Sequence, residues 1–255
     1  DVDLDELSQL IGSDVEMKGQ INGWGFLSNP YKNLSYMGDA IVENLFLNKQ
    51  EVGNVFIQSQ WSKEIGNVTF NGDLVRRGDQ TLRFDGQYLL NKEKDNLDFA
   101  LLFKNTDLKF TNAFMDPEVV KGIEGKINGK ILVKGSPDHP LLSGKLKLQN
   151  AAANIELLGV RYTLNGEVEV VEDAFYINNL PVKDEDGNTA SLVGQIYHKN
   201  FDKWDYNMNF NFEDDLTKRD PQAPYRNLPL ERFLVMKTTY KQGDYYYGKA
   251  YARGT

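Results

Sequence analysis

Apolar and polar residues alternate along most of this chain with a period of two, which is the period of a β-strand. The clearest strand covers residues 205–212, where every second residue is apolar and the others are Asp205 and three asparagines. Similar alternation covers 126–134, 145–148 and 164–170. Because each segment has one apolar and one polar side, the pattern predicts antiparallel strands in a sheet that faces water on one side only.

The apolar sides of these strands define a predicted binding face. Such a face either closes against an opposing sheet, as in a sandwich, or lines an open groove, and the alternation is the same in both cases. The residues predicted to line it are Ile127, Ile131, Val133, Leu146, Leu148, Leu164, Val168, Val170, Leu192, Ile196, Tyr206, Met208, Phe210 and Phe212.

A short motif, apolar-x-Gly-x-apolar, recurs at irregular intervals. The strand period places its glycine on the same face as the two apolar residues, which favours a bend or a close approach at that point. Glycine also marks corners and bulges in many β-proteins, so a single copy is open to either interpretation. The copies lie at 17–21, 70–74, 84–88, 123–127, 127–131, 142–146, 164–168 and 192–196.

Helical periodicity is nearly absent, and two short helices are predicted. Residues 3–11 begin with acidic side chains and end before Gly12, which is typical of a helix start and stop. Residues 116–122 combine Asp116 as N-cap with Pro117 at the first helical position and a glycine at the end.

Turn-forming residues divide the rest of the chain into strands. The chain contains 22 glycines and many asparagines, and polar loops are predicted at 91–96 and 135–140. Residues 213–229 contain three prolines and are predicted to leave the sheet, whereas 245–255 alternate like a final strand. No linker separates two cores, so residues 1–255 are predicted to form a single elongated segment of a longer protein.

Composition excludes several classes of protein. Lys and Arg number 29 against 37 Asp and Glu, a net charge of −8, which argues against nucleic acid as a partner. The absence of cysteine removes thiol nucleophiles, Fe–S clusters and cysteine-based zinc sites. No apolar run reaches the ~18 residues of a membrane-spanning helix.

No residue set points to catalysis, so the chain is predicted to be no enzyme, with no catalytic residue, metal site or cofactor. The only histidines, His139 and His198, lack partners at metal-ligand spacing. The loop 184–188 gathers carboxylates around a glycine, but it lacks the spacing of an EF-hand, which favours a hairpin turn. Asp214 and Asp215 would form a glycosidase pair only if the fold brought them together suitably, and exposed charge is the simpler interpretation.

From about Gly122 onward, the order of motifs resembles the C-terminal domain of the translocation and assembly module protein TamB in its Bacteroidetes-type form. This family belongs to the AsmA-like group of bridge-like lipid-transfer proteins. Residues 65–90 are similar to the preceding region of the family more loosely, and the proline-rich stretch 221–229 departs from the family pattern. The matching motifs are GKING at 125–129, VKGSP at 133–137, PLLSGKL at 140–146, GVRY at 159–162, VKDEDGNTA at 182–190, GQIYH at 194–198 followed by Phe201, and YYGKA at 246–250.

The resemblance implies an all-β fold: a long, curved, mostly antiparallel sheet folded lengthwise into an open hydrophobic groove, called a β-taco, with one or two short helices. It implies a non-enzymatic segment of an inner-membrane-anchored protein that lies in the periplasm. There it would shield the acyl chains of phospholipid, its expected partner, in transit between the inner and outer membranes. An Omp85-type outer-membrane barrel protein is the second expected partner.

Two other functions remain open. The same family is implicated in outer-membrane protein assembly, so the sheet is alternatively a scaffold for β-barrel translocation and assembly with the Omp85-type partner. A carbohydrate-binding β-domain would use exposed tryptophans as sugar platforms, and the candidates are Trp24, Trp61 and Trp204.

Overall fold

The computed structural model describes residues 2–5, 16–29, 31, 33–63, 66–92, 94–199, 203–211, 233–237, 245–247 and 251–254. Nearly all described residues lie in strands; the described residues also include a 3₁₀ helix, η1, and the helical residues Leu4 and Asp5. The elements are β1 (Val2–Asp3), β2 (Met17–Ser28), β3 (Ser35–Leu47), β4 (Gln50–Ser62), β5 (Asn67–Arg76), β6 (Asp79–Leu89), β7 (Leu97–Asp107), η1 (Leu108–Ala113), β8 (Val120–Ser136), β9 (His139–Ile155), β10 (Val160–Glu172), β11 (Ala174–Lys183), β12 (Thr189–Lys199), β13 (Lys203–Asn211), β14 (Leu234–Lys237), β15 (Tyr245–Tyr247) and β16 (Tyr251–Gly254).

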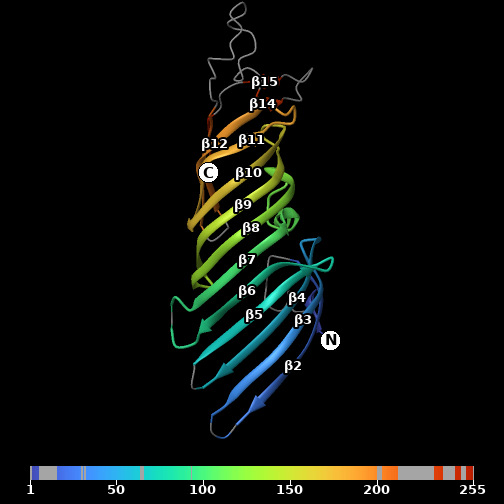
Figure 1. Cartoon of the computed structure of the whole chain (residues 1–255), viewed down its shortest axis with the longest axis vertical. Helices are drawn as coiled ribbons and strands as arrows, with labels where there is room; N and C mark the ends of the chain where they lie inside the picture. Colours follow the sequence, from blue (N-terminus) through green and yellow to red (C-terminus); the bar gives the residue numbers. More distant parts are fainter. Residues whose placement is uncertain are drawn as a thin grey trace, which may run out of the picture. The chain divides into compact units, whose positions relative to one another are not determined.

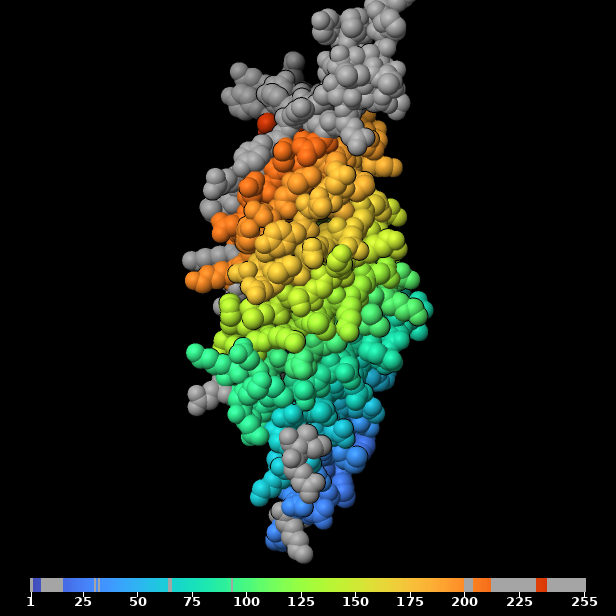
Figure 2. Space-filling model, turned by 60° about the vertical axis from the view of Figure 1, so that its left-hand side comes forward, coloured from blue at the N-terminus to red at the C-terminus, as the bar shows by residue number. Residues whose placement is uncertain are grey.

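The described strands confirm the predicted all-β fold with a curved, open, antiparallel sheet. Strands β1 to β13 pair in sequence order, and β16 pairs with β13. Figure 1 shows the order from β2 to β12. Strands β14 and β15 form a separate two-stranded sheet. Antiparallel neighbours need only short turns, which is why a chain rich in asparagine and glycine folds as a meander. The strands appear as successive bands of colour on the surface (Figure 2).

The chain divides into two units. Unit 1 comprises the described residues of 1–114 and 127–145, and unit 2 those of 115–126 and 146–255. The long hairpin of β8 and β9 contributes to both units. Each unit is described by itself below.

Unit 1 has one apolar and one polar face, as the alternation predicts. Across the sheet, Ile57 of β4 pairs with Gly72, Gly72 with Phe84, and Phe84 with Leu101, so that these four residues share a face. The register places Asp73 and the exposed Leu102 on the opposite face, because side chains alternate along each strand. The polar face is acidic in part, and its Asp73 accepts hydrogen bonds from the Arg83 guanidinium at 3.0 Å and 3.4 Å. That arginine holds the pKa of the Asp73 carboxyl below its usual value.

The recurring glycines of unit 1 accept aromatic rings from the neighbouring strand. Phe99 of β7 lies directly opposite Gly86 of β6, and a Cβ at Gly86 would lie 2.6 Å from the Cδ1 of that ring. A Cβ at Gly72 would likewise collide with the ring of Phe84 and with the carbonyl of Phe56. The in-phase glycines therefore allow large rings to lie flat across the apolar face, which is the close approach that the motif predicts.

Asparagines inside the strands form bulges in addition to turns. Asn44 in β3 and Asn150 in β9 have φ values of 52° and 47°, a left-handed conformation that asparagine tolerates better than most residues. In each case an asparagine on the following strand accepts the displaced backbone N–H: Asn54 for Asn44 at 2.9 Å, and Asn165 for Asn150 at 2.7 Å. The register of β3 against β4 shifts around Asn44, as expected of a bulge, and in both strands the N–H of the left-handed residue keeps an acceptor.

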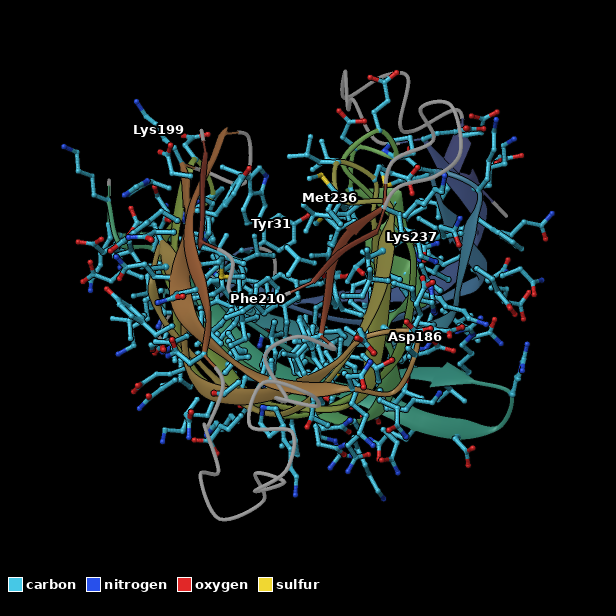
Figure 3. The ribbon with its side chains drawn as sticks, turned by 90° about the horizontal axis from the view of Figure 1, so that it is seen from above. Tyr31, Asp186, Lys199, Phe210, Met236 and Lys237 are labelled. Atoms are coloured by element: carbon cyan, nitrogen blue, oxygen red, sulfur yellow. The ribbon has the colours of Figure 1, made fainter. Side chains whose placement is uncertain are left out.

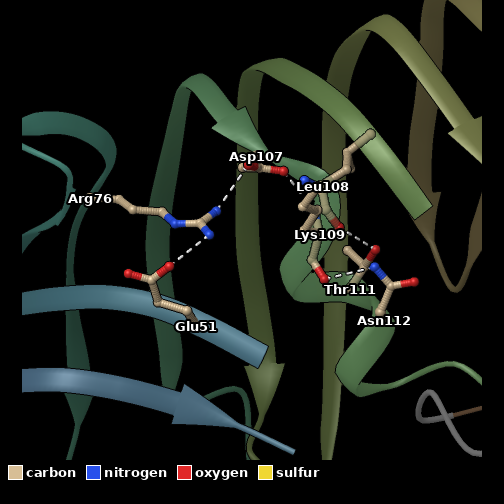
Figure 4. A network of polar contacts seen from close by, with 7 residues as sticks. All are labelled: Glu51, Arg76, Asp107, Leu108, Lys109, Thr111 and Asn112. Carbon is tan, nitrogen blue, oxygen red and sulfur yellow. Dashed lines mark hydrogen bonds and ion pairs between the residues drawn. The ribbon is translucent and has the colours of Figure 1, made fainter. Parts of the chain in front are cut away.

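An arginine joins η1 to two strands of unit 1 (Figure 4). Arg76 at the end of β5 contacts Glu51 of β4 at 3.1 Å and Asp107 at 3.0 Å. Asp107 is also the N-cap of η1, because its carboxylate accepts the backbone N–H of Lys109 at 3.0 Å. The network thus fixes the point where the chain leaves β7.

The helix predicted at 116–122 does not form as expected. Asp116 does cap the backbone N–H of Glu118 at 2.8 Å, but the segment makes one turn and then enters β8 at Val120. The carbonyl of Val119 already accepts a hydrogen bond from Glu156 at 3.0 Å, so sheet pairing replaces the second helical turn. Of the helix predicted at 3–11, Asp3 instead pairs in β1 with Gln20, Leu4 and Asp5 are helical, and residues 6–11 lie outside the described residues.

The predicted final strand is also divided. Tyr245–Tyr247 form β15, which pairs with β14, whereas Tyr251–Gly254 form β16, which pairs with β13. The two short strands therefore belong to different sheets, a partition that alternation cannot reveal because both pieces have the same period. The predicted excursion at 213–229 lies outside the described residues. The predicted loop at 91–96 falls between β6 and β7, whereas the predicted loop at 135–140 is shorter than expected, because β8 continues to Ser136 and β9 begins at His139.

Candidate apolar binding face

The predicted face residues of β10, β12 and β13 share one face of unit 2. The register pairs Leu192 with Phe210 and Ile196 with Tyr206, and Gly194 lies opposite Met208. Most of these residues join a single apolar cluster. From the predicted set it contains Val168, Leu192 and Phe210 as buried members, with Leu148, Leu164, Ile196 and Met208 packed against them.

The other predicted residues have different surroundings. Val170 is buried, and Leu146 and Tyr206 are half-buried, but none of the three belongs to that cluster. In unit 1, Ile127 and Ile131 are buried and Val133 is half-buried. Phe212 lies outside the described residues.

The cluster also contains residues that the alternation did not identify. They are Val160, Tyr162, Ile177, Leu180, Val182, Phe233 and Leu234. Ile177 and Leu180 are three residues apart yet on one face, because β11 contains a bulge between them at which Asn179 has a φ of 55°. A strict period of two cannot follow a face across such a bulge. The signal that could have revealed Phe233 and Leu234 is the short apolar run 233–236.

A segment from far along the chain fills the apolar face of unit 2. Phe233 and Leu234 have no exposed surface. The Phe233 ring stacks on Tyr162 of β10 with centroids 5.7 Å apart, and it lies 5.3 Å from Phe210 of β13. Tyr162 and Phe210 also meet, at 5.4 Å. Figure 3 shows Phe210 and the segment that carries Met236 on the inner side of the curved strands.

Polar contacts fix the backbone of this segment. The carboxylate of Asp184, which is 5% exposed, accepts the backbone N–H of Leu234 at 2.8 Å. The Tyr162 hydroxyl lies 3.1 Å and 3.0 Å from the carbonyl oxygens of Leu234 and Val235 and donates to them. The backbone N–H of Lys237 donates to the carbonyl of Leu158 at 2.7 Å, and the Lys237 ammonium pairs with Glu185. Burial, with the added effect of the Asp184 charge, raises the pKa of Tyr162, so the phenol remains a donor at neutral pH.

The loop that carries Asp184 is a hairpin turn, as predicted. The Asp184 N–H donates to the Asn188 carbonyl at 3.0 Å, and the Gly187 N–H donates to the Asp184 carbonyl at 3.1 Å. Gly187 has a φ of 86°, which explains the glycine at this position. One carboxylate therefore closes the turn through Asn188 and binds Leu234, a second role that the sequence did not indicate.

The apolar face of unit 1 differs from that of unit 2 in its exposure. Five apolar residues on its central strands are all half-buried, and none of them is fully buried: Ile57, Phe70, Phe84, Phe99 and Leu101. Phe70 and Phe99 approach each other with ring centroids 6.0 Å apart. Aromatic and aliphatic surface on these central strands is therefore partly in contact with water, whereas Val168, Leu192 and Phe210 at the centre of the unit 2 face are buried.

His198 is packed among aromatic rings in unit 2. It is 4% exposed, and its ring lies 5.4 Å from Trp204 and 5.8 Å from Phe175. Burial lowers the pKa of His198, and the opposing effect of Asp173 is smaller. The side chain is thus kept neutral and contributes to packing.

Other candidate residues form no recognisable catalytic or metal arrangement within the described part of the chain. His139 is exposed at the turn between β8 and β9, where it lines a cleft of about 580 Å³ with Tyr88 and Asn96. No group of three or more His, Asp or Glu side chains that could hold a metal occurs among the residues described. Asp214 and Asp215 lie outside them.

The tryptophans proposed as sugar platforms are distributed over both units. Trp24 is 56% exposed on the face of unit 1 opposite to the apolar one, where it pairs with Asp39. Trp61 and Trp204 are half-buried. The three do not form one platform in either unit.

Comparisons with protein-family models, with curated proteins and with solved structures give no match. The resemblance to the TamB family therefore remains a prediction. In the part of the chain that the structure describes, no helix is long and apolar enough to cross a membrane.

Proposed function

We propose that this protein binds the acyl chains of phospholipids on the apolar face of its curved sheet and carries them without chemical change. The observation that carries this proposal is the half-buried apolar face of unit 1, built from Phe70, Phe84, Phe99 and their neighbours. A soluble sheet rarely leaves a continuous row of aromatic and aliphatic side chains partly exposed unless something covers it.

The physical basis is the transfer of hydrocarbon out of water. An acyl chain that covers this face gains about 0.8 kcal/mol for each buried CH₂ group. The headgroup stays in water at the open side of the sheet, so the protein needs no specific polar pocket for it. A carrier of this kind also needs no catalytic group.

The cellular setting is part of the same proposal. The sequence resemblance to TamB supports a setting in the periplasm, as part of an inner-membrane-anchored protein that works with an Omp85-type outer-membrane partner. In that setting the segment would shield phospholipid between the two membranes.

Two adjacent residues of β7 provide the test. Leu101 lies on the apolar face opposite Phe84, whereas Leu102 lies on the other face and is 50% exposed. Phospholipid that copurifies with the full chain is extracted and quantified by mass spectrometry for the wild type, Leu101→Glu and Leu102→Glu.

We expect Leu101→Glu to fold and to lose at least about fivefold in bound phospholipid, because a carboxylate on this face would have to be desolvated by the acyl chain. Leu102→Glu should retain wild-type amounts. A wild-type protein without bound lipid that also takes none from vesicles would refute the proposal, as would equal losses in the two variants.

The scaffold function has a separate observation in its favour. Among the described residues, β2 pairs on its outer side with Val2 and Asp3 alone, and an edge strand is the element to which another chain adds by strand pairing. A photoreactive side chain at Leu27 of β2 should then crosslink to a folding outer-membrane barrel protein. Failure to crosslink during barrel assembly would argue against this alternative.

A further inference from the structure

The segment 233–237 occupies in unit 2 the type of surface that is half-exposed in unit 1. Phe233 and Leu234 are fully buried, between Tyr162 and Phe210. These two side chains cover residues predicted from the sequence to contact a bound chain, among them Leu192 and Phe210. The part of the unit 2 face around Tyr162, Leu192 and Phe210 is therefore filled by the protein itself.

The segment contacts the large sheet through buried side chains and individual hydrogen bonds, and not through a strand ladder. In the described structure β14 forms no ladder with the large sheet; its ladder is with β15 alone. Its polar contacts to the rest of unit 2 include those with the Asp184 carboxylate, the Tyr162 hydroxyl, the carbonyl of Leu158 and the Glu185 carboxylate. By comparison, β12 pairs with β13 continuously from Ser191 to Lys199.

We infer that residues 233–237 form an internal occupant that keeps the apolar face of unit 2 closed to acyl chains until it is displaced. This inference rests on the proposed function. The phenyl and isobutyl groups of Phe233 and Leu234 take the volume that methylene groups would fill, and both kinds of surface gain from leaving water. An acyl chain and the segment therefore compete for one face.

The competition has a consequence for affinity. A ligand binds only the fraction of molecules in which its site is open, so its apparent affinity falls in proportion to that fraction. In the resting protein unit 1 is available to lipid and unit 2 is not. Displacement of the segment adds the face of β10 to β13 to the binding surface.

Photolabelling tests whether lipid reaches the apolar face of unit 1 but not that of unit 2. The full chain is mixed with phosphatidylcholine vesicles that contain a phosphatidylcholine with a diazirine on one acyl chain. After irradiation, labelled peptides are assigned by mass spectrometry to β5–β7 of unit 1 or to β10–β13 of unit 2. The variants are Phe233→Ser with Leu234→Ser, which removes both buried side chains, and Leu157→Ser, a matched control at a residue of unit 2 that is 75% exposed.

In the wild type and in Leu157→Ser we expect labelling of β5–β7 and near-background labelling of β10–β13. The double variant should increase labelling of β10–β13 at least about tenfold, because it removes two buried apolar side chains from the competing segment. Labelling of β5–β7 should not change.

The outcomes separate the two proposals. If no protein in the series is labelled, the proposed function is wrong. If β5–β7 are labelled but β10–β13 are labelled equally in the wild type, or stay at background in the double variant, the internal occupant is wrong and the proposed function stands.

A conservative variant covers the case in which the double variant does not fold. Tyr162→Phe keeps the ring that stacks on Phe233 and removes only the hydroxyl that holds the carbonyls of Leu234 and Val235. Loss of these hydrogen bonds should raise labelling of β10–β13 by about threefold to tenfold. If Tyr162→Phe has a wild-type circular dichroism spectrum and wild-type labelling, the inference is overturned.

Discussion

Replacement of Asp184 by alanine should release the segment 233–237 without unfolding the sheet. The carboxylate accepts the N–H of Leu234 at 2.8 Å and the N–H of Asn188 at 2.8 Å. Leu234 has no exposed surface, so its N–H would remain buried without this acceptor, at a cost of about 1–3 kcal/mol. Asn188 is only half-buried and can donate to water instead. We therefore expect the free energy that holds the segment 233–237 docked on the sheet to fall by about 2–3 kcal/mol.

Hydrogen exchange measures this loss directly. Each 1.4 kcal/mol taken from the free energy of local opening raises the exchange rate tenfold. The Leu234 amide should therefore exchange about 30- to 100-fold faster in Asp184→Ala than in the wild type. The Leu192 amide, within the β12 ladder, should change much less. Asp186→Ala is the matched control, because Asp186 is an exposed carboxylate in the same turn.

Three results would contradict this reasoning. One is an unchanged exchange rate at Leu234. Another is an equal acceleration in Asp186→Ala, which would assign the effect to charge or to the turn. The third is an equal acceleration at Leu192, which would show that the segment and the sheet open together.

Two further predictions concern stability. Gly72→Ala should lower the free energy of unfolding by about 1–3 kcal/mol in urea titrations, because the added Cβ collides with a facing ring and a carbonyl. The control Asn71→Ala, on the exposed face, should stay within about 0.5 kcal/mol of the wild type. Equal effects of the two substitutions would contradict the role assigned to the glycine. The free energy of unfolding should fall as the pH is lowered from about 7.5 to 5.5. Burial lowers the pKa of His198 in the folded state, whereas the unfolded chain keeps the ordinary histidine pKa of about 6.5. The unfolded chain therefore binds the proton more readily, and acid favours unfolding. His198→Gln should reduce this slope and His139→Gln, at an exposed position, should not; a slope unaffected by His198→Gln would contradict the prediction.

Much of the face could be predicted because it depends on local geometry. In 126–134, for example, Lys126, Lys130 and Lys134 are exposed while Ile127 and Ile131 are buried, as the period of two requires. The prediction lost accuracy where that geometry changes. The bulge at Asn179 moved Leu180 onto the apolar face, and sheet pairing at Val119 ended a helix that Asp116 had begun.

The sequence by itself determined that the chain forms strands, and for most of them which side is apolar, because both properties follow from neighbours two residues apart. Only the tertiary structure decided what covers that side. Tyr162 and Leu234 are 72 residues apart in sequence, and no local pattern specifies that one binds the other. The half-buried central strands of unit 1 and the buried centre of the unit 2 face have the same alternation, because burial in unit 2 also depends on a distant segment that docks there.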